Sequence, residues 1–153
     1  METQGVAHSV SILLKLTVEN RISEIPRVLD AVDGVFDALP PDDDSRFAMK
    51  LAIDEVLTNI IQYAFPETEH HHVRLEMRAE GDFVHCTMED GGPAFDPLAR
   101  AAPDLDLDVE DREIGGLGIH FAKESMQKLR YERQDGRNVL YMARRLGLDT
   151  GST

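Results

Sequence analysis

The acids Asp54 and Glu55 interrupt an apolar helical pattern in the segment LAIDEVLTNI (residues 51–60). Glu55 and Asn59 stand four positions apart, which places both side chains on one face of a helix. An amide oxygen is a hard ligand of the kind that Mg²⁺ accepts beside water and phosphate oxygens. A carboxylate one turn away is placed to act as a general base toward a hydroxyl group. The same spacing also fits the solvated edge of an ordinary helix.

A second candidate site follows a predicted strand, in the segment DGGPAFDP (residues 90–97). The Asp90 carboxylate only accepts hydrogen bonds, so it could select the exocyclic amino group of adenine and reject guanine. Gly91 and Gly92 would let the backbone approach the edge of a ring. An acidic residue in a simple β-turn is the alternative interpretation.

A third candidate is the glycine run in EIGGLGIHFAKES (residues 113–125), which opens a predicted helix. Free backbone amides at a helix N-terminus form an anion site. The run matches neither a P-loop nor the dinucleotide-binding fingerprint. A tight loop-to-helix turn would use the same glycines.

Three other features are expected to carry no chemistry. The acidic run at residues 104–115 resembles a calcium loop, but Val109 stands where the glycine is required and Gly115 where the bidentate Glu is required. The adjacent residues His70, His71 and His72 cannot converge like metal ligands spaced one turn apart. Cys86 is expected to be a buried strand residue without a base beside it.

The composition narrows the class of protein. The chain has 153 residues and a formal net charge of −13, so a nucleic acid partner is not expected. No apolar run approaches the ~20 residues that a membrane helix needs, and no secretory signal is visible. A single cysteine excludes an internal disulfide and fits a reducing compartment, which favours the cytoplasm.

The elements that would position these residues are read from periodicity. A half-buried strand is predicted from apolar residues at period two: Val10, Ile12, Leu14, Leu16 and Val18. Helices are predicted at 19–39, with Ser23 as N-cap and Pro26 in the first turn, then at 46–65 and 115–129. Hairpins are predicted at 72–90 and 130–146, the second around Gln134-Asp135-Gly136.

Helices and antiparallel-rich strands segregate in this order, which predicts an α+β two-layer sandwich. The sheet is expected to be mixed but mostly antiparallel, with helices on one face. We expect a single domain over residues 1–153, with an ordered core of about 9–146 and a long loop from about residue 93 to 114.

The order and spacing of the three candidate motifs resemble those of the GHKL ATPases, which share the Bergerat ATP-binding fold. The segments LAIDEVLTNIIQYAF, DGGPAFDP, GGLGIHF and RYERQDGRNVLYM are most similar to the serine-protein kinase branch of anti-sigma factors, the RsbW and SpoIIAB type. The resemblance covers roughly residues 9–146.

The resemblance implies a role for each matched position. Asn59 would coordinate the Mg²⁺ that bridges the phosphates of ATP, and Glu55 would be the general base. Asp90 would bind the adenine amino group, with Gly92 beside the ring. The other nucleotide contacts would come from Phe95, Gly115, Gly116, Leu117, Gly118 and Asn138. Residues 97–114 would form the ATP lid, and Arg27 would contact partner proteins.

One position departs from the family pattern. Many GHKL proteins carry Gly-Thr in the last hairpin, and the Thr hydroxyl helps to hold adenine. This chain has Gly136-Arg137-Asn138 there. Either Asn138 replaces the hydroxyl through its amide, or the contact is absent.

The implied function is that of a bacterial, cytoplasmic transcription regulator. It would be an ATP-dependent serine-protein kinase that phosphorylates a Ser or Thr of a STAS-domain antagonist. It would also be an anti-sigma factor that sequesters a sigma factor. The protein would act as a homodimer. The alternative is a catalytically weak ATP/ADP-binding interaction module that switches partners through ordering of the lid. The presence of both Glu55 and Asn59 favours the enzyme.

Overall fold

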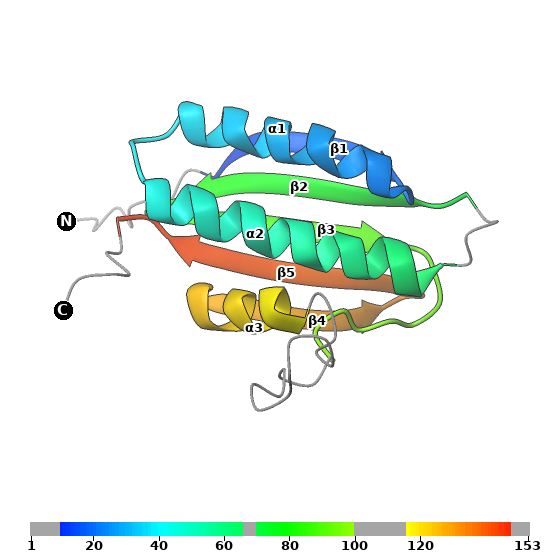
Figure 1. Cartoon of the computed structure of the whole chain (residues 1–153). Coiled ribbons are helices and arrows are strands. Elements are labelled where there is room, and N and C mark those ends of the chain that lie inside the picture. The colour runs from blue at the N-terminus through cyan, green and yellow to red at the C-terminus, as the bar shows by residue number, and fades with distance from the viewer. Residues whose placement is uncertain (1–9, 66–69, 100–115, 148–153) are drawn as a thin grey trace, which may run out of the picture.

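The computed structural model describes residues 10–65, 70–99 and 116–147. These residues form one five-stranded sheet with helices on one face (Figure 1). The sheet order β1-β2-β3-β5-β4 is made by β1 (Val10–Glu19), β2 (His72–Glu80), β3 (Phe83–Asp90), β4 (Lys128–Gln134) and β5 (Arg137–Arg145). The helices are α1 (Ile25–Asp37), α2 (Asp43–Asn59) and α3 (Gly116–Ser125), with a 3₁₀ turn η1 (Ile22–Glu24) and a π-helical turn η2 (Ile60–Ala64).

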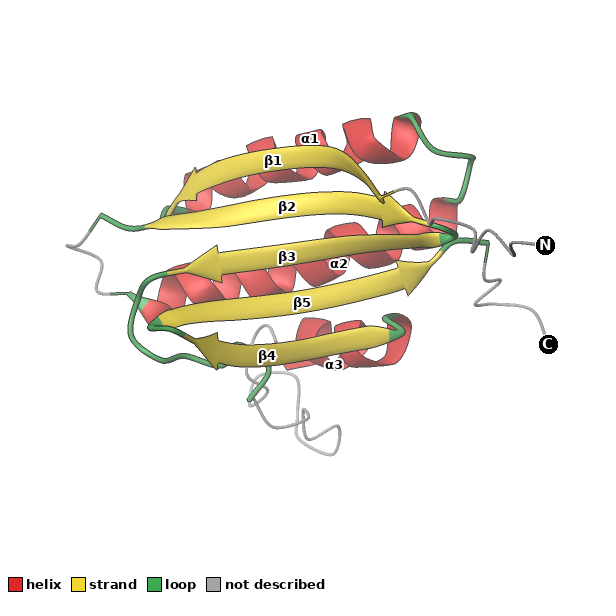
Figure 2. Ribbon diagram, turned by 180° about the vertical axis from the view of Figure 1, so that it is seen from behind, coloured by secondary structure: helices red, strands yellow, loops and turns green. Residues whose placement is uncertain are grey.

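The predicted α+β two-layer sandwich is confirmed. Figure 2 shows the second face of the sheet without helices. The sheet was expected to be mixed, yet every neighbouring pair of described strands is antiparallel. The reason is the path of the last hairpin: β3 and β4 run in the same direction, but β5 returns between them and pairs with both.

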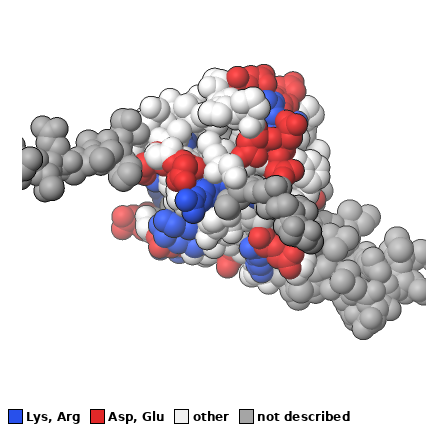
Figure 3. Space-filling model, turned by 90° about the vertical axis from the view of Figure 1, so that its left-hand side faces the viewer, with Lys and Arg blue, Asp and Glu red and all other residues white. Residues whose placement is uncertain are grey.

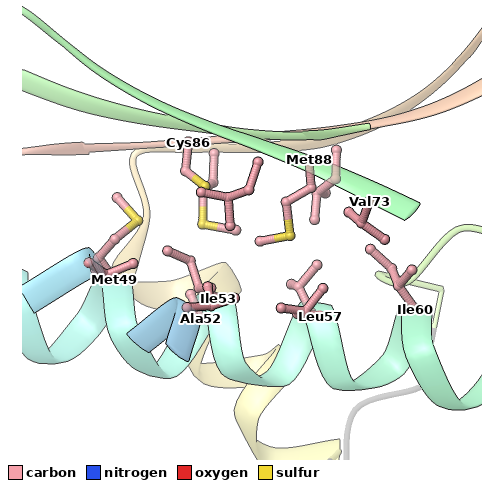
Figure 4. Packing of buried hydrophobic residues seen from close by; sticks show 14 of the residues in the cluster. Met49, Ala52, Ile53, Leu57, Ile60, Val73, Cys86 and Met88 are labelled. Carbon is pink, nitrogen blue, oxygen red and sulfur yellow. The ribbon is translucent and has the colours of Figure 1, made fainter. Parts of the chain in front are cut away.

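Helix α2 supplies the centre of the core. Its apolar face lies against the middle strands, where Met49, Ile53 and Leu57 point toward Cys86 and Met88 (Figure 4). All five side chains are fully or almost fully buried. The burial of this face fixes the rotation of α2, and therefore decides which of its polar residues point elsewhere.

The N-terminus of α2 is capped by Asp42. The Asp42 carboxylate accepts hydrogen bonds from the Ser45 amide at 3.0 Å and the Ser45 hydroxyl at 2.7 Å. Asp43 and Asp44 occupy the first turn, where the helix dipole favours negative charge. Burial alone would raise the pKa of Asp42, but the hydrogen bonds from Gly147 and Ser45 hold this pKa below its usual value.

The C-terminal end of the predicted helix 46–65 differs from expectation. The α-helix ends at Asn59, and the next five residues form the π turn η2. Such turns occur often at functional sites. Here the change from α-helix to π-helix comes directly after Asn59, the candidate metal ligand.

A β-bulge in β1 corrects the predicted facing of that strand. The register shifts between Ile12 and Leu14, so Leu14, Leu16 and Val18 face the core as expected, whereas Ile12 pairs with Arg78 on the uncovered face. Val10 and Ile12 are 49% and 55% exposed. One extra residue in a strand reverses the facing of everything beyond it.

Two element ends also differ from the predictions. Ser23 lies inside η1 and is not an N-cap; α1 begins at Ile25, with Pro26 in its first turn as expected. Helix α3 ends at Ser125, because the Gln127 amide already donates to the Ala143 carbonyl of β5 at 3.0 Å and strand pairing begins there.

Charge is distributed unequally between the two layers. Acidic residues concentrate on α1 and α2: Asp30, Asp33, Asp37, Asp43, Asp44, Asp54 and Glu55. The uncovered sheet face carries most of the basic strand residues: Lys15, Arg74, Arg78, Lys128, Arg130, Arg137 and Arg145. In the end-on view of Figure 3 acidic atoms gather mainly toward the helices, at the upper right. No helix within the described ranges is long and apolar enough to cross a membrane.

Candidate functional site

The predicted site residues come from elements that meet at one end of the sandwich. Helix α2 ends there at Asn59, β3 ends at Asp90, and β5 begins next to Asn138 (Figure 1). This convergence follows from the topology, because α2 crosses the sheet with its C-terminus above the last residues of β3. Three sequence motifs far apart in the chain are thereby brought to one region.

Glu55 lies directly against the start of α3. A Cβ atom built on Gly118 would be 1.8 Å from Glu55 Cγ and 2.7 Å from its Oε1. Gly118 is buried, and only a residue without a side chain fits beside this carboxylate. The structure therefore places the candidate base at the glycine turn that was predicted to hold phosphate.

Asn59 is 3% exposed and faces the segment that follows β3. Its Nδ2 donates a long hydrogen bond of 3.4 Å to the Pro97 carbonyl. A cavity of about 340 Å³ opens beside it, lined by Asn59, Tyr63, Phe95, Asp96, Pro97 and Ala99. This volume is at the lower end of the range for small-molecule sites.

Asp90 is 2% exposed and ends β3 in a tight turn. Its Oδ1 accepts hydrogen bonds from the Gly92 amide and from Asn138 Nδ2, both at 2.9 Å. Gly92 lies against Phe65: a Cβ atom on Gly92 would be 2.2 Å from the Phe65 ring. The glycine is needed at this position because an aromatic ring occupies the space that a side chain would take.

Asn138 joins this turn to the last hairpin. It is 4% exposed and contacts Asp90, Pro93 and Phe95. Phe95 is half-buried, and its backbone amide donates to Asn138 Oδ1 at 3.1 Å. The predicted residues Asp90, Gly92, Phe95 and Asn138 therefore form one connected group.

Two contributors to this group were not predicted. Arg133 Nη1 donates to the Gly92 carbonyl at 2.7 Å and to Asn138 Oδ1 at 3.1 Å. The Tyr131 hydroxyl also donates to Asn138 Oδ1. A signal for both residues exists in the sequence: the two-residue turn Asp135-Gly136 sets the hairpin register that pairs Arg133 with Asn138.

Next to this cavity lies a much narrower one, on the side of Asp90. Its walls are Ile60, Met88, Asp90, Phe95, Pro97, Tyr131, Asn138 and Leu140. It leaves no room for a water molecule. Phe95 and Pro97 line both cavities, so a movement of the segment 95–97 would join them into one.

The donor set fits a magnesium ion that has few protein ligands. Asn59 is almost fully buried, and its Oδ1 accepts no hydrogen bond from the described residues. Within the described ranges no three His, Cys, Asp or Glu side chains gather like a closed metal site. Mg²⁺ binds in this way when substrate phosphates and water supply the other ligands.

Neither a histidine nor the cysteine adds chemistry to this region. His71 stacks on Phe65 with ring centroids 4.2 Å apart. Cys86 is buried in the core, and burial raises the pKa of its thiol to about 12. A thiolate nucleophile is therefore excluded at neutral pH.

Some predicted residues lie away from this group or outside the described residues. Arg27 is on the exposed side of α1, where its guanidinium binds Glu24 at 2.9 Å and the Thr17 carbonyl at 3.1 Å. Its predicted role in partner binding stays a prediction. Gly115 and most of the predicted lid, residues 100–114, fall outside the described residues, and Gly116 and Leu117 are placed only as the first residues of α3.

Comparison with known proteins identifies relatives. The family model of the histidine kinase-like ATPase domain matches residues 18–144. The serine/threonine-protein kinase BtrW of Bordetella bronchiseptica is 34% identical over 95 residues, which are 62% of this chain and 67% of that protein. The serine-protein kinase RsbW of Listeria monocytogenes is 27% identical over 96 residues, 60% of this chain and 61% of that protein.

A solved structure has the same fold. It contains the RsbU and RsbW domains of Rv1364c from Mycobacterium tuberculosis and superposes with a TM-score of 0.63 at 15% identity. The match covers 87% of this chain and 32% of that chain. These matches confirm the resemblance drawn from the sequence, while the chain spans only about two thirds of the two kinases and one third of the solved protein.

Proposed function

The chain belongs to the histidine kinase-like ATPase family, and we propose that it is an ATP-dependent serine-protein kinase and anti-sigma factor. It transfers the γ-phosphate of ATP to a Ser or Thr of a STAS-domain antagonist and sequesters a sigma factor. The names of the related kinases support the reaction class.

One observation carries the proposal: Glu55 lies against Gly118. A nucleotide-binding module without phosphotransfer needs no carboxylate at the glycine turn. A kinase needs one there, because the base must reach the hydroxyl that attacks the γ-phosphate. This position favours the enzyme over the binding module.

Each residue then has a defined task. Asp90 accepts a hydrogen bond from the adenine amino group, and Gly118 leaves backbone amides open to the phosphates. Asn59 would hold Mg²⁺ through its amide oxygen, and the ion would supply neutralisation of the phosphate charge when bound. Glu55 takes the proton of the incoming Ser or Thr hydroxyl. Segment 95–97 separates the two cavities, and it must shift before the adenine ring can enter.

The distribution of charge supports a location for the partner site. The acidic helix layer would attract a basic partner surface, and Arg27, paired with Glu24, is a basic group on the exposed side of α1. The proposed partners are the STAS antagonist and the sigma factor, in a homodimeric, cytoplasmic protein without nucleic acid contact. Residues 97–114 are proposed as the ATP lid.

Phosphotransfer tests the proposal directly. The protein is incubated with γ-labelled ATP, Mg²⁺ and small STAS-domain proteins, each as wild type and with the acceptor Ser replaced by Ala. Label on a wild-type STAS protein but not on its Ser→Ala form is the expected result. Glu55→Gln should lower this transfer on the order of 10²–10⁴-fold and keep ATP binding.

Asp54→Asn is the matched control, since Asp54 is the neighbouring acid and instead bonds Thr58 at 3.2 Å. It should transfer label like the wild type. ATP binding without transfer to any STAS protein would replace the kinase with the binding module. Failure to bind ATP would overturn the proposal entirely.

A further inference from the structure

We propose that Asn138 is a positioning residue: it orients the Asp90 carboxylate toward the adenine ring and does not bind adenine itself. This inference rests on the proposed ATP site. It decides between the two possibilities left by the missing Gly-Thr pattern. The case is built from the hydrogen-bonding capacity of one buried amide.

Both donors of the Asn138 amide are used inside the protein. A primary amide nitrogen carries two N–H groups. One is directed to Asp90 Oδ1 at 2.9 Å and the other to the Pro93 carbonyl at 2.8 Å. No donor remains for a ring nitrogen of a ligand.

The amide oxygen is equally occupied. Asn138 Oδ1 accepts from the Phe95 amide at 3.1 Å, from Arg133 Nη1 at 3.1 Å and from the Tyr131 hydroxyl. A carbonyl oxygen has two lone pairs, so these three donors saturate it. Since Asn138 is only 4% exposed, breaking any of these bonds to reach a ligand would leave a buried group unsatisfied.

The same contacts determine how Asp90 is presented. The amides of Gly92 and Asn138 both donate to Oδ1. Oδ2 accepts no hydrogen bond from the described residues, and the carboxylate is thereby fixed with one oxygen left for a ligand. A Thr at position 138 has one hydroxyl donor and could not bond Asp90 and Pro93 together. Asn138 therefore gives this turn a tether that the usual Thr does not provide.

The test compares two nucleotides that differ only at the group Asp90 is proposed to bind. Affinities of ATP and of purine riboside triphosphate, which has hydrogen in place of the 6-amino group, are measured by calorimetry for four proteins. These are the wild type, Asn138→Ala, Asp90→Ala and the double variant. The wild type should prefer ATP by roughly 10- to 100-fold, the scale of a hydrogen bond to a charged group.

If Asn138 acts through Asp90, Asn138→Ala should reduce this preference to within about threefold, and the double variant should show no further loss beyond Asp90→Ala. A direct adenine contact predicts otherwise: either an unchanged preference in Asn138→Ala or an additional loss in the double variant. Both results would overturn the inference. A wild type that binds neither nucleotide would overturn the proposed function itself.

Two further proteins exclude a general structural effect. Gln127→Ala is a matched control from the opposite end of the sheet, where Gln127 Oε1 accepts from the Arg145 amide at 2.6 Å; its ATP preference should equal that of the wild type. Should Asn138→Ala fail to fold, the isosteric Asn138→Asp replaces the donor to Asp90 with an acceptor. It is expected to lose the preference, and its retention would overturn the inference.

Discussion

Replacing Gly118 by Ala tests the contact on which the proposed phosphotransfer depends. The new Cβ would lie 1.8 Å from Glu55 Cγ, and ordinary contact begins at 3.4 Å. One of the two groups must therefore move by about 1.6 Å. Glu55 is the group expected to move, because Gly118 is fixed in the backbone of α3 while the Glu55 side chain can rotate.

The structure gives separate magnitudes for activity and stability. A displacement of about 1 Å at a reacting group costs on the order of 10²-fold in rate, so Gly118→Ala should lose at least about 100-fold in phosphotransfer. Overpacking costs about 1–3 kcal/mol, and the higher helix propensity of Ala returns up to about 1 kcal/mol. The net loss in unfolding free energy should be about 0–3 kcal/mol.

The assays are urea denaturation and transfer of labelled phosphate, with Gly34→Ala as the matched control. Gly34 is also helical but has no atom within 4 Å of its built Cβ, so the control should gain about 0.5–1 kcal/mol and keep its activity. Adding Glu55→Ala to Gly118→Ala should remove the clash and recover stability. Phosphotransfer within threefold of the wild type in Gly118→Ala would refute the reasoning.

Two further predictions concern the metal and the pH. Asn59→Ala should abolish the Mg²⁺ dependence of ATP affinity with little change in stability, since among the described residues it removes only the long bond to Pro97. ATP titrations with and without Mg²⁺ check this, and an equal Mg²⁺ response in both proteins contradicts it. Burial, assisted by the charge of Arg78, lowers the pKa of His85 below 6.5. The unfolded chain therefore binds a proton at this imidazole more readily than the folded protein does. The free energy of unfolding should fall as pH drops from 6.5 through the folded pKa. Urea midpoints between pH 8 and 5 should decline less in His85→Gln than in the exposed control His120→Gln, and equal declines would exclude His85 as the cause.

The sequence predicted the residues whose positions depend on short-range geometry. Glu55 and Asn59 share a helix face by spacing alone, and Asp90 ends a strand bounded by glycines. Their convergence followed only from the family resemblance, because no local pattern shows that α2 and β3 end side by side. The neighbourhood of Asn138 was within reach, since the Asp135-Gly136 turn sets the register with Arg133.

Other features were hidden because two structures fit the same pattern. Leu13 and Leu14 are both apolar, so a bulge in β1 can bury either one and the period-two pattern does not decide. The π turn was hidden for a related reason: Ile60, Ile61, Ala64 and Phe65 form a wide apolar stripe that fits an α or a π turn. Packing against the rest of the protein determines both the position of the bulge and the type of the turn.

The bulge in β1 also has a consequence for how the molecule meets its neighbours. β1 is an outer strand of the described sheet, and a long straight edge invites strands of other molecules to add on and aggregate. The kink between Ile12 and Leu14 breaks that edge. A foreign strand would find uninterrupted pairing only along Leu14–Glu19, so the bulge shortens the edge that ten-residue β1 offers to other molecules.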